Sequence, residues 1–180
     1  MTITLVDVAG ANFRPDEDGD LKNNEFMTRL GVKARYIPAR LAIARSLAAQ
    51  GSPPPREYHV ELGRAIKGDT LFGTGASLAT WFALIVQKAD GNVGSLKELL
   101  SLVSAHWSRG LSLLESEWRH ADGHEFAFIR RLVDVAGLPA RGGGRIADAA
   151  GHHGGSGAGP IEVPFGELST DLTTRSEVRW

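Results

Sequence analysis

The feature that most constrains the fold of this sequence is a long amphipathic segment near its middle. Ser95 and Glu98 form the pattern of a capping box. After them, large apolar residues recur with a period of about 3.6 residues and fall on one face of a helix. That stripe consists of Leu96, Leu99, Leu100, Val103, Trp107, Leu111, Leu114 and Trp118. The segment predicts a long helix and, with it, a mainly α-helical fold.

Shorter helices are predicted on both sides of this segment. Asn23 or Asn24 can cap a helix that runs through Leu30 and stops at Gly31. Pro38 is pre-set for the first turn of a second helix, which Gly51 closes. A third helix is predicted after Ser77, and a cap pattern at Asp122 and Glu125 predicts a last one. The apolar stripes of the second and third are Ile37, Leu41, Ala44 and Ala48, and Leu78, Trp81, Phe82 and Ile85.

The remaining segments are expected to be extended or irregular. Alternation of Ile3 and Leu5 with threonines predicts a short strand within residues 1–10. Asn12 to Asp20 is acidic and contains Pro and Gly, so we expect a loop there. Residues 58–72 are expected to form an extended or irregular connection. The fold class is therefore a compact multi-helix domain with a short N-terminal strand.

The composition changes abruptly after residue 141. Eight of the 19 residues from Gly142 to Pro160 are Gly, which predicts a flexible linker. We divide the chain into an acidic leader (1–22), a helical domain (23–141), the linker (142–160) and a C-terminal tail (161–180). The tail is either a docking peptide or the truncated start of a further domain. Its docking face would consist of Ile161, Val163, Phe165 and Leu168.

Composition excludes several classes of protein. The chain has no Cys, so it has no disulfide, no thiolate nucleophile and no Cys-based metal site. Its longest dense apolar run, Leu78 to Val86, is too short to span a bilayer. The first residues lack the basic and apolar regions of a secretory signal. We therefore expect a cytoplasmic protein without a membrane contact.

Catalytic and metal-binding motifs are weak. The sequence has neither a nucleophile elbow nor the Gly-Lys-Ser/Thr ending of a phosphate-binding loop. Gly73 and Gly75 precede a helix and could form an anion-accepting nest, but a simple turn is the preferred interpretation. His120, Asp122 and His124 are interpreted as surface and capping residues rather than metal ligands. We expect no enzyme activity, no metal and no cofactor.

The basic part of the chain lies around the second helix. Residues 25–67 contain eight Lys and Arg against three Glu, although the whole chain has a net charge of −1. These cations can neutralise phosphates, and without Asn or Gln on that surface they would contact the DNA backbone with little sequence readout. The alternative is a solvated helix face. The candidate DNA-binding residues are Arg29, Lys33, Arg35, Arg40, Arg45 and Lys67.

Two segments carry a resemblance to a known family. Met27 to Arg35 (MTRLGVKAR), followed by Ile37 to Leu47 (IPARLAIARSL), resembles the small helical DndE proteins of bacterial DNA sulfur modification. Gly68 to Gly73 (GDTLFG) and the helix after it are also similar to that family, and the whole resemblance covers roughly residues 23–137. It implies a helical fold, a homo-oligomer (a tetramer in the family) and binding of the DNA backbone with preference for nicked duplex. It maps the DNA-contacting surface to Arg29, Lys33, Arg35 and Arg40.

The resemblance also implies a context. The protein would work beside the machinery that replaces a phosphate oxygen by sulfur, or in a related phage-defence system. Residues 161–167 (IEVPFGE) are faintly similar to the opening strand of a HerA/FtsK-type translocase, which implies a partner ATPase or a fragment of a fused protein. The first hypothesis is therefore a non-enzymatic, DNA-binding, oligomeric subunit of a modification or defence complex. The second is a structural adaptor that oligomerises through its helical domain and recruits a partner through its tail.

Overall fold

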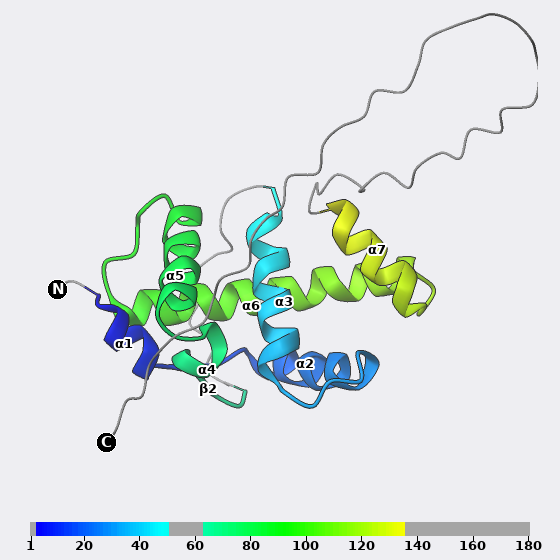
Figure 1. Ribbon diagram of the computed structural model, residues 1–180, viewed down its shortest axis with the longest axis horizontal. Coiled ribbons are helices and arrows are strands. Elements are labelled where there is room, and N and C mark those ends of the chain that lie inside the picture. The colour runs from blue at the N-terminus through cyan, green and yellow to red at the C-terminus, as the bar shows by residue number, and fades with distance from the viewer. Residues whose placement is uncertain (1–2, 51–62, 136–180) are drawn as a thin grey trace, which may run out of the picture. The chain divides into compact units, whose positions relative to one another are not determined.

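The structure is a computed structural model that describes residues 3–50 and 63–135, and this part of the chain is mainly α-helical (Figure 1). The predicted linker and tail lie outside the described residues. No helix in the described ranges combines the length and the apolar character needed to cross a membrane. The elements in chain order are α1 (Leu5–Gly10), β1 (Asn12–Phe13), α2 (Glu17–Arg29), α3 (Tyr36–Ala48), β2 (Ile66–Lys67), α4 (Gly68–Phe72), α5 (Ala76–Lys88), α6 (Leu96–His120) and α7 (Glu125–Val135).

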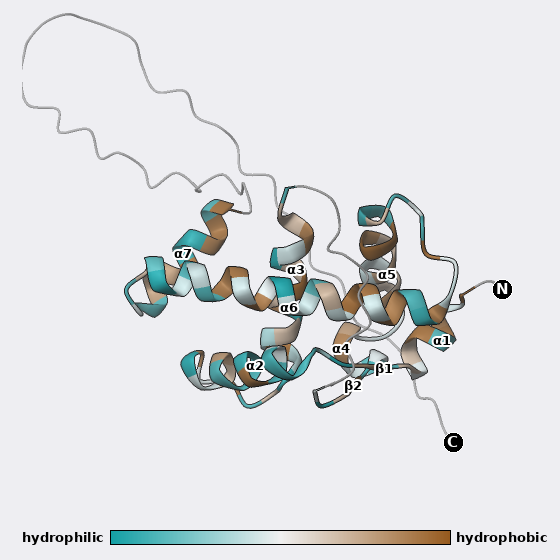
Figure 2. Ribbon diagram, turned by 180° about the vertical axis from the view of Figure 1, so that it is seen from behind, coloured by the Kyte–Doolittle hydropathy of each residue, from teal (hydrophilic) through white to brown (hydrophobic). Residues whose placement is uncertain are grey.

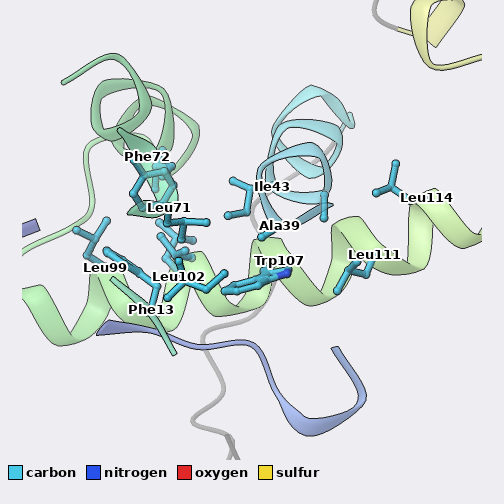
Figure 3. Packing of buried hydrophobic residues seen from close by; sticks show 14 of the residues in the cluster. Phe13, Ala39, Ile43, Leu71, Phe72, Leu99, Leu102, Trp107, Leu111 and Leu114 are labelled. Atoms are coloured by element: carbon cyan, nitrogen blue, oxygen red, sulfur yellow. The ribbon is translucent and has the colours of Figure 1, made fainter. Parts of the chain in front are cut away.

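Helix α6 runs the length of the described domain, and α3 crosses it (Figure 1). Five residues of the α6 stripe, from Leu99 to Leu114, are buried, and its end residues are partly buried. Ala39 and Ile43 of α3 lie over Trp107 of α6 (Figure 3). Gly110 permits the close crossing, because a Cβ atom there would lie 1.9 Å from the main-chain oxygen of Ala42. The predicted central helix is thus confirmed, and its buried face forms the middle of the core.

Aromatic rings extend this core along α6. Near the start of α6, the ring of Phe13 meets the ring of Phe72 edge-on at a centroid distance of 5.1 Å. Near its end, Phe128 of α7 packs at 5.2 Å from the ring of Trp118 and at 6.2 Å from that of Phe26. Residues of α1, β1 and α2 therefore complete the same core as the central helices.

Strands β1 and β2 form a short antiparallel ribbon. Asn12 is paired with Lys67 and Phe13 with Ile66. Two further main-chain bonds bracket the ribbon: the N–H of Gly68 donates to Ala11 (2.8 Å) and that of Gly63 donates to Pro15 (2.9 Å). Phe13 and Ile66 are buried, so the alternate residues face outward.

The predicted strand within residues 1–10 is wrong in its position. Leu5–Gly10 is a helix, and the strand begins at Asn12. Thr4 and Asp7 close a capping box around the first turn of α1: the Thr4 N–H donates to Asp7 Oδ2 (3.0 Å) and the Asp7 N–H donates to Thr4 Oγ1 (3.2 Å). These two bonds stabilise the helical conformation over the extended one.

The predicted loop from Asn12 to Asp20 is also corrected. Asp16 accepts a hydrogen bond from the Gly19 N–H (2.6 Å) and begins α2 well before the predicted cap. Asn23 instead lies buried within α2, where it accepts from Trp107 Nε1 (3.1 Å). Asp122 does not cap α7, since it lies in a turn with a φ of 49°.

Candidate nucleic-acid interface

The six predicted DNA-binding cations do not form one open cluster. Arg35 is the first exception to the prediction: its side chain is only 18% exposed and forms an ion pair with Asp20. Its Nη1 also donates to Asn24 Oδ1 at 2.6 Å. Asp20 Oδ1 in addition accepts the main-chain N–H of Arg64 (3.1 Å). Arg35 therefore joins the start of α3 to α2, and Asp20 joins both to the segment before β2.

Arg40 binds the end of a helix. Its Nε donates to the carbonyl oxygen of Leu71, and its Nη2 donates to that of Thr70 at 3.1 Å. The guanidinium also lies 4.6 Å from the ring centroid of Tyr36. Both acceptors are at the carboxyl end of α4, where carbonyl groups have no partner within the helix. The Arg40 side chain thus links α3 to the carboxyl end of α4.

Arg45 takes part in a partly buried ion-pair network. It lies 3.2 Å from Glu117, which also accepts from Arg131 Nε at 2.9 Å. Burial would raise the pKa of Glu117, but the hydrogen bonds from Arg131 and Arg45 outweigh it and hold that pKa below its ordinary value. The network connects α3, α6 and α7, and Arg45 does not face open solvent.

Cationic side chains also donate hydrogen bonds to carbonyl groups at the carboxyl end of α3. Arg109 Nη2 donates to the carbonyl oxygen of Ser46, and Lys88 Nζ donates to that of Ala49 (2.8 Å). Ser46 Oγ accepts from Arg109 Nε (2.8 Å) and lies 2.8 Å from Nδ1 of the buried His106. Burial, together with the charges of Arg109 and Lys88, lowers the pKa of His106 to about 4. His106 is therefore neutral at pH 7 and belongs to the interior.

The other three predicted residues remain closer to solvent. Arg29 pairs with Glu25 at 3.3 Å and lies over the rings of Phe26 and Trp118. Lys33 is exposed in the α2–α3 turn and has no ion pair with the described residues. Lys67 is exposed on β2 and pairs with Asp69 at 2.9 Å.

The ribbon adds two cations that were missing from the prediction. Its outward face consists of four exposed residues, Asn12, Arg14, Ala65 and Lys67. Arg14 Nη1 donates to the carbonyl oxygen of Gly63 (3.3 Å), and Arg64, the next residue along the chain, is also exposed. Arg14 and Lys67 are diagonal neighbours on this ribbon, and such neighbours are about 7–8 Å apart. Arg14 and Lys67 therefore share one surface.

Asp20 connects this surface to the α2–α3 turn. It binds both Arg35, two residues after Lys33, and the main chain of Arg64. The turn and the segment leading into β2 both lie along the lower edge of the view in Figure 1. We call Arg14, Lys33, Arg64 and Lys67 the basic edge. Among the described residues, only Lys67 of these four forms an ion pair.

No local signal identified Arg14 or placed it beside Lys67. Arg14 lies in an acidic part of the sequence, and its ribbon partners follow about fifty residues later, so only the pairing of β1 with β2 brings them together. The predicted docking residues Ile161, Val163, Phe165 and Leu168 lie outside the described residues.

Comparison with known proteins gives one match. Residues 21–122, more than half of the chain, match the family model described as DNA sulphur modification protein DndE. The matched range contains most of α2 and all of α3, β2, α4, α5 and α6. No curated protein and no solved structure matches the chain.

Proposed function

The chain belongs to the DndE family of DNA sulphur modification proteins, and we propose that it acts there as a non-enzymatic, homo-oligomeric subunit that binds the DNA backbone. The resemblance drawn from the sequence is confirmed, and the protein is involved in DNA sulfur modification. The finer proposal includes a cytoplasmic location, partner proteins of the same machinery and a role in phage defence. The observation that supports DNA binding is the basic edge.

The basic edge suits a polyanion in charge and in shape. Arg14 and Lys67 lie on the outward face of a narrow ribbon, Arg64 is exposed at its end and Lys33 is exposed in the α2–α3 turn. An antiparallel ribbon is thin enough to enter the major groove of DNA. Arg14 and Arg64 can each form two parallel bonds to a phosphate. Asn12 is the only amide on the outward face of the ribbon, so contacts to phosphate outnumber those that read bases.

The test is the salt dependence of DNA binding. Each neutralised phosphate contributes about 0.9 unit, so four phosphate contacts predict a slope of about −3.6 in log K against log salt for each protomer that contacts the duplex. Affinity of the full chain for nicked and intact duplexes of one sequence is measured by fluorescence anisotropy across a salt series. Lys33→Gln and Arg14→Gln should each flatten the slope by about 1 unit.

Arg119→Gln provides the matched control, because Arg119 is also exposed but lies at the end of α6, away from the basic edge. It removes the same charge and should leave the slope unchanged. Absence of binding to both duplexes at low salt would overturn the proposal. Equal slopes for all three variants would reject the basic edge as the contact surface.

The structural adaptor remains the second candidate. It is favoured by the internal contacts of Arg35, Arg40 and Arg45, which reduce the charge that the α3 region offers to DNA. Its tail would recruit a sulfur-modification protein or a partner ATPase. Deleting residues 142–180 separates the two functions: an adaptor loses its purified partner in a pull-down, whereas a DNA-binding subunit keeps its full affinity for duplex.

A further inference from the structure

Helix α7 carries an apolar face that the described domain does not cover. Phe126, Ile129 and Val133 are spaced by three and four residues, so they form one stripe. All three are exposed, and Phe126 is 82% exposed. Surface apolar residues are normally scattered singly, and a stripe of three large ones on one helix indicates an interaction surface. We call these three residues the α7 outer face; α7 also shows apolar residues between hydrophilic ones in Figure 2.

The opposite side of α7 fixes the helix in place. Phe128 is fully buried against the rings of Trp118 and Phe26. Arg131 holds the helix to Glu117 of α6 at 2.9 Å. Because these contacts set the rotation of the helix, the α7 outer face cannot turn inward without breaking them.

The charged residues beside this face can pair with the same residues of a second copy. Arg130 and Asp134 lie one turn apart along the same flank, and neither forms an ion pair with the described residues. Glu125 and Asp134 balance Arg130 and Arg131, so the helix has no net charge. In an antiparallel pair of such helices, Arg130 of each copy approaches Asp134 of the other, which is the reciprocal pattern of a two-fold interface.

We propose that the α7 outer face pairs with the same face of a second copy of this chain, with the two helices antiparallel about a two-fold axis. The inference deepens the homo-oligomeric part of the proposed function and rests on it. It assigns a contact to a helix that lies beyond residue 122, where the family match ends. A polyanion does not fit this surface, because its centre is apolar and its flank carries both signs of charge.

The geometry limits the strength of this contact. A helix of 11 residues is about 16 Å long. One of its faces covers a few hundred Å² per copy, well below the roughly 800 Å² per partner of a standard interface. The pairing is therefore weak by itself, and in an oligomer held by other surfaces it adds a second contact.

Sedimentation velocity of the full chain over a range of concentrations tests the proposal. The weight-average mass should rise with concentration, and Phe126→Asp should weaken the association at least about tenfold. Val6→Asp is the matched control, because Val6 is 80% exposed but lies on α1. It introduces the same charge in place of an equally exposed apolar residue and should leave the association unchanged.

The flank gives a sharper test of the antiparallel arrangement. Arg130→Asp and Asp134→Arg each place like charges opposite one another in a self-pair, so each variant alone should associate less than the wild type. A mixture of the two variants should associate again, because their flanks then have opposite charge. Circular dichroism confirms that each variant is folded.

The outcomes separate this inference from the proposed function. Association that Phe126→Asp leaves unchanged would overturn the α7 contact while the oligomer itself stands. A monomer at every concentration would overturn both, and it is also the outcome expected if another segment of the same chain covers the face. DNA affinity is measured separately on the same variants, so loss of DNA binding and loss of pairing are distinguished.

Discussion

Gly110 lies where α3 and α6 cross, and we expect Gly110→Ala to cause a large loss of stability. The added Cβ would lie 1.9 Å from the Ala42 oxygen and 2.3 Å from its carbonyl carbon. Both atoms belong to the main chain of α3, so a change of rotamer cannot relieve the contact. The two helices must separate instead, and the packing of Ile43 against Trp107 loosens with them.

The magnitude follows from two opposing terms. Overpacking of a well-packed core costs about 1–3 kcal/mol and occasionally more, and a contact this short with main-chain atoms belongs at the upper end. Replacing Gly by Ala within a helix returns up to about 1 kcal/mol. The free energy of unfolding should therefore fall by about 2–3 kcal/mol, which corresponds to a decrease in Tm of about 10 °C for a domain of this size.

Urea denaturation followed by circular dichroism measures this loss. Gly10→Ala is the control, because a Cβ at Gly10 meets no atom within 4 Å, and we expect a change below about 1 kcal/mol. Adding Ala42→Gly to Gly110→Ala should not restore stability, since the clash involves the carbonyl group rather than the Ala42 side chain. A Gly110→Ala protein as stable as the wild type would refute the close crossing of α3 and α6.

Three further predictions concern polar side chains that form contacts within the domain. The pKa of His106 is lowered to about 4 in the folded protein, so the unfolded chain binds more protons between pH 4 and 6.5. The free energy of unfolding should therefore fall by up to about 3 kcal/mol as the pH decreases through that window. His106→Gln should remove this pH dependence. A wild-type stability profile identical to that of the variant would contradict the prediction. Arg40→Met removes two charged hydrogen bonds from the end of α4 and should lower the free energy of unfolding by about 2 kcal/mol, with no change in the salt slope of DNA binding. A flattened slope would instead make Arg40 a DNA contact. Asn23→Leu leaves the Trp107 N–H without its acceptor and should destabilise the protein by about 1–3 kcal/mol. Urea denaturation followed by tryptophan fluorescence measures this loss, and an unchanged midpoint would contradict the observed bond.

The parts of the fold that the sequence predicted are those with a local signal. Helix α6 has a long apolar stripe and a Ser95 cap, and both features lie within the segment itself. Helix α1 was missed because the alternation of Ile3 and Leu5 is too short to separate a strand from a helix, and the bonds between Thr4 and Asp7 decide between them. The acidic residues after Asp16 favour a loop by composition, but carboxylates also favour the first turn of a helix.

The candidate interface was less predictable, because its geometry depends on distant parts of the chain. Arg40 and Arg45 lie off the apolar stripe of α3, a position that predicts exposure of both side chains to solvent. Their long side chains instead reach acceptors 31 and 72 residues away in sequence, a carbonyl group of Leu71 and the carboxylate of Glu117. A count of charges along the chain does not distinguish a cation that serves such an acceptor from one that is available to a ligand.

The core described above also defines what must be kept when this protein is shortened. A fragment trimmed to residues 21–122 would retain the family signature but lose Val8, Phe13 and Phe128, all of them fully enclosed. It would also lose Asp20 and, with it, the junction between α2, Arg35 and Arg64. The cooperative folding unit therefore extends past the recognisable homology at both ends, and expression boundaries should be placed outside α1 and α7.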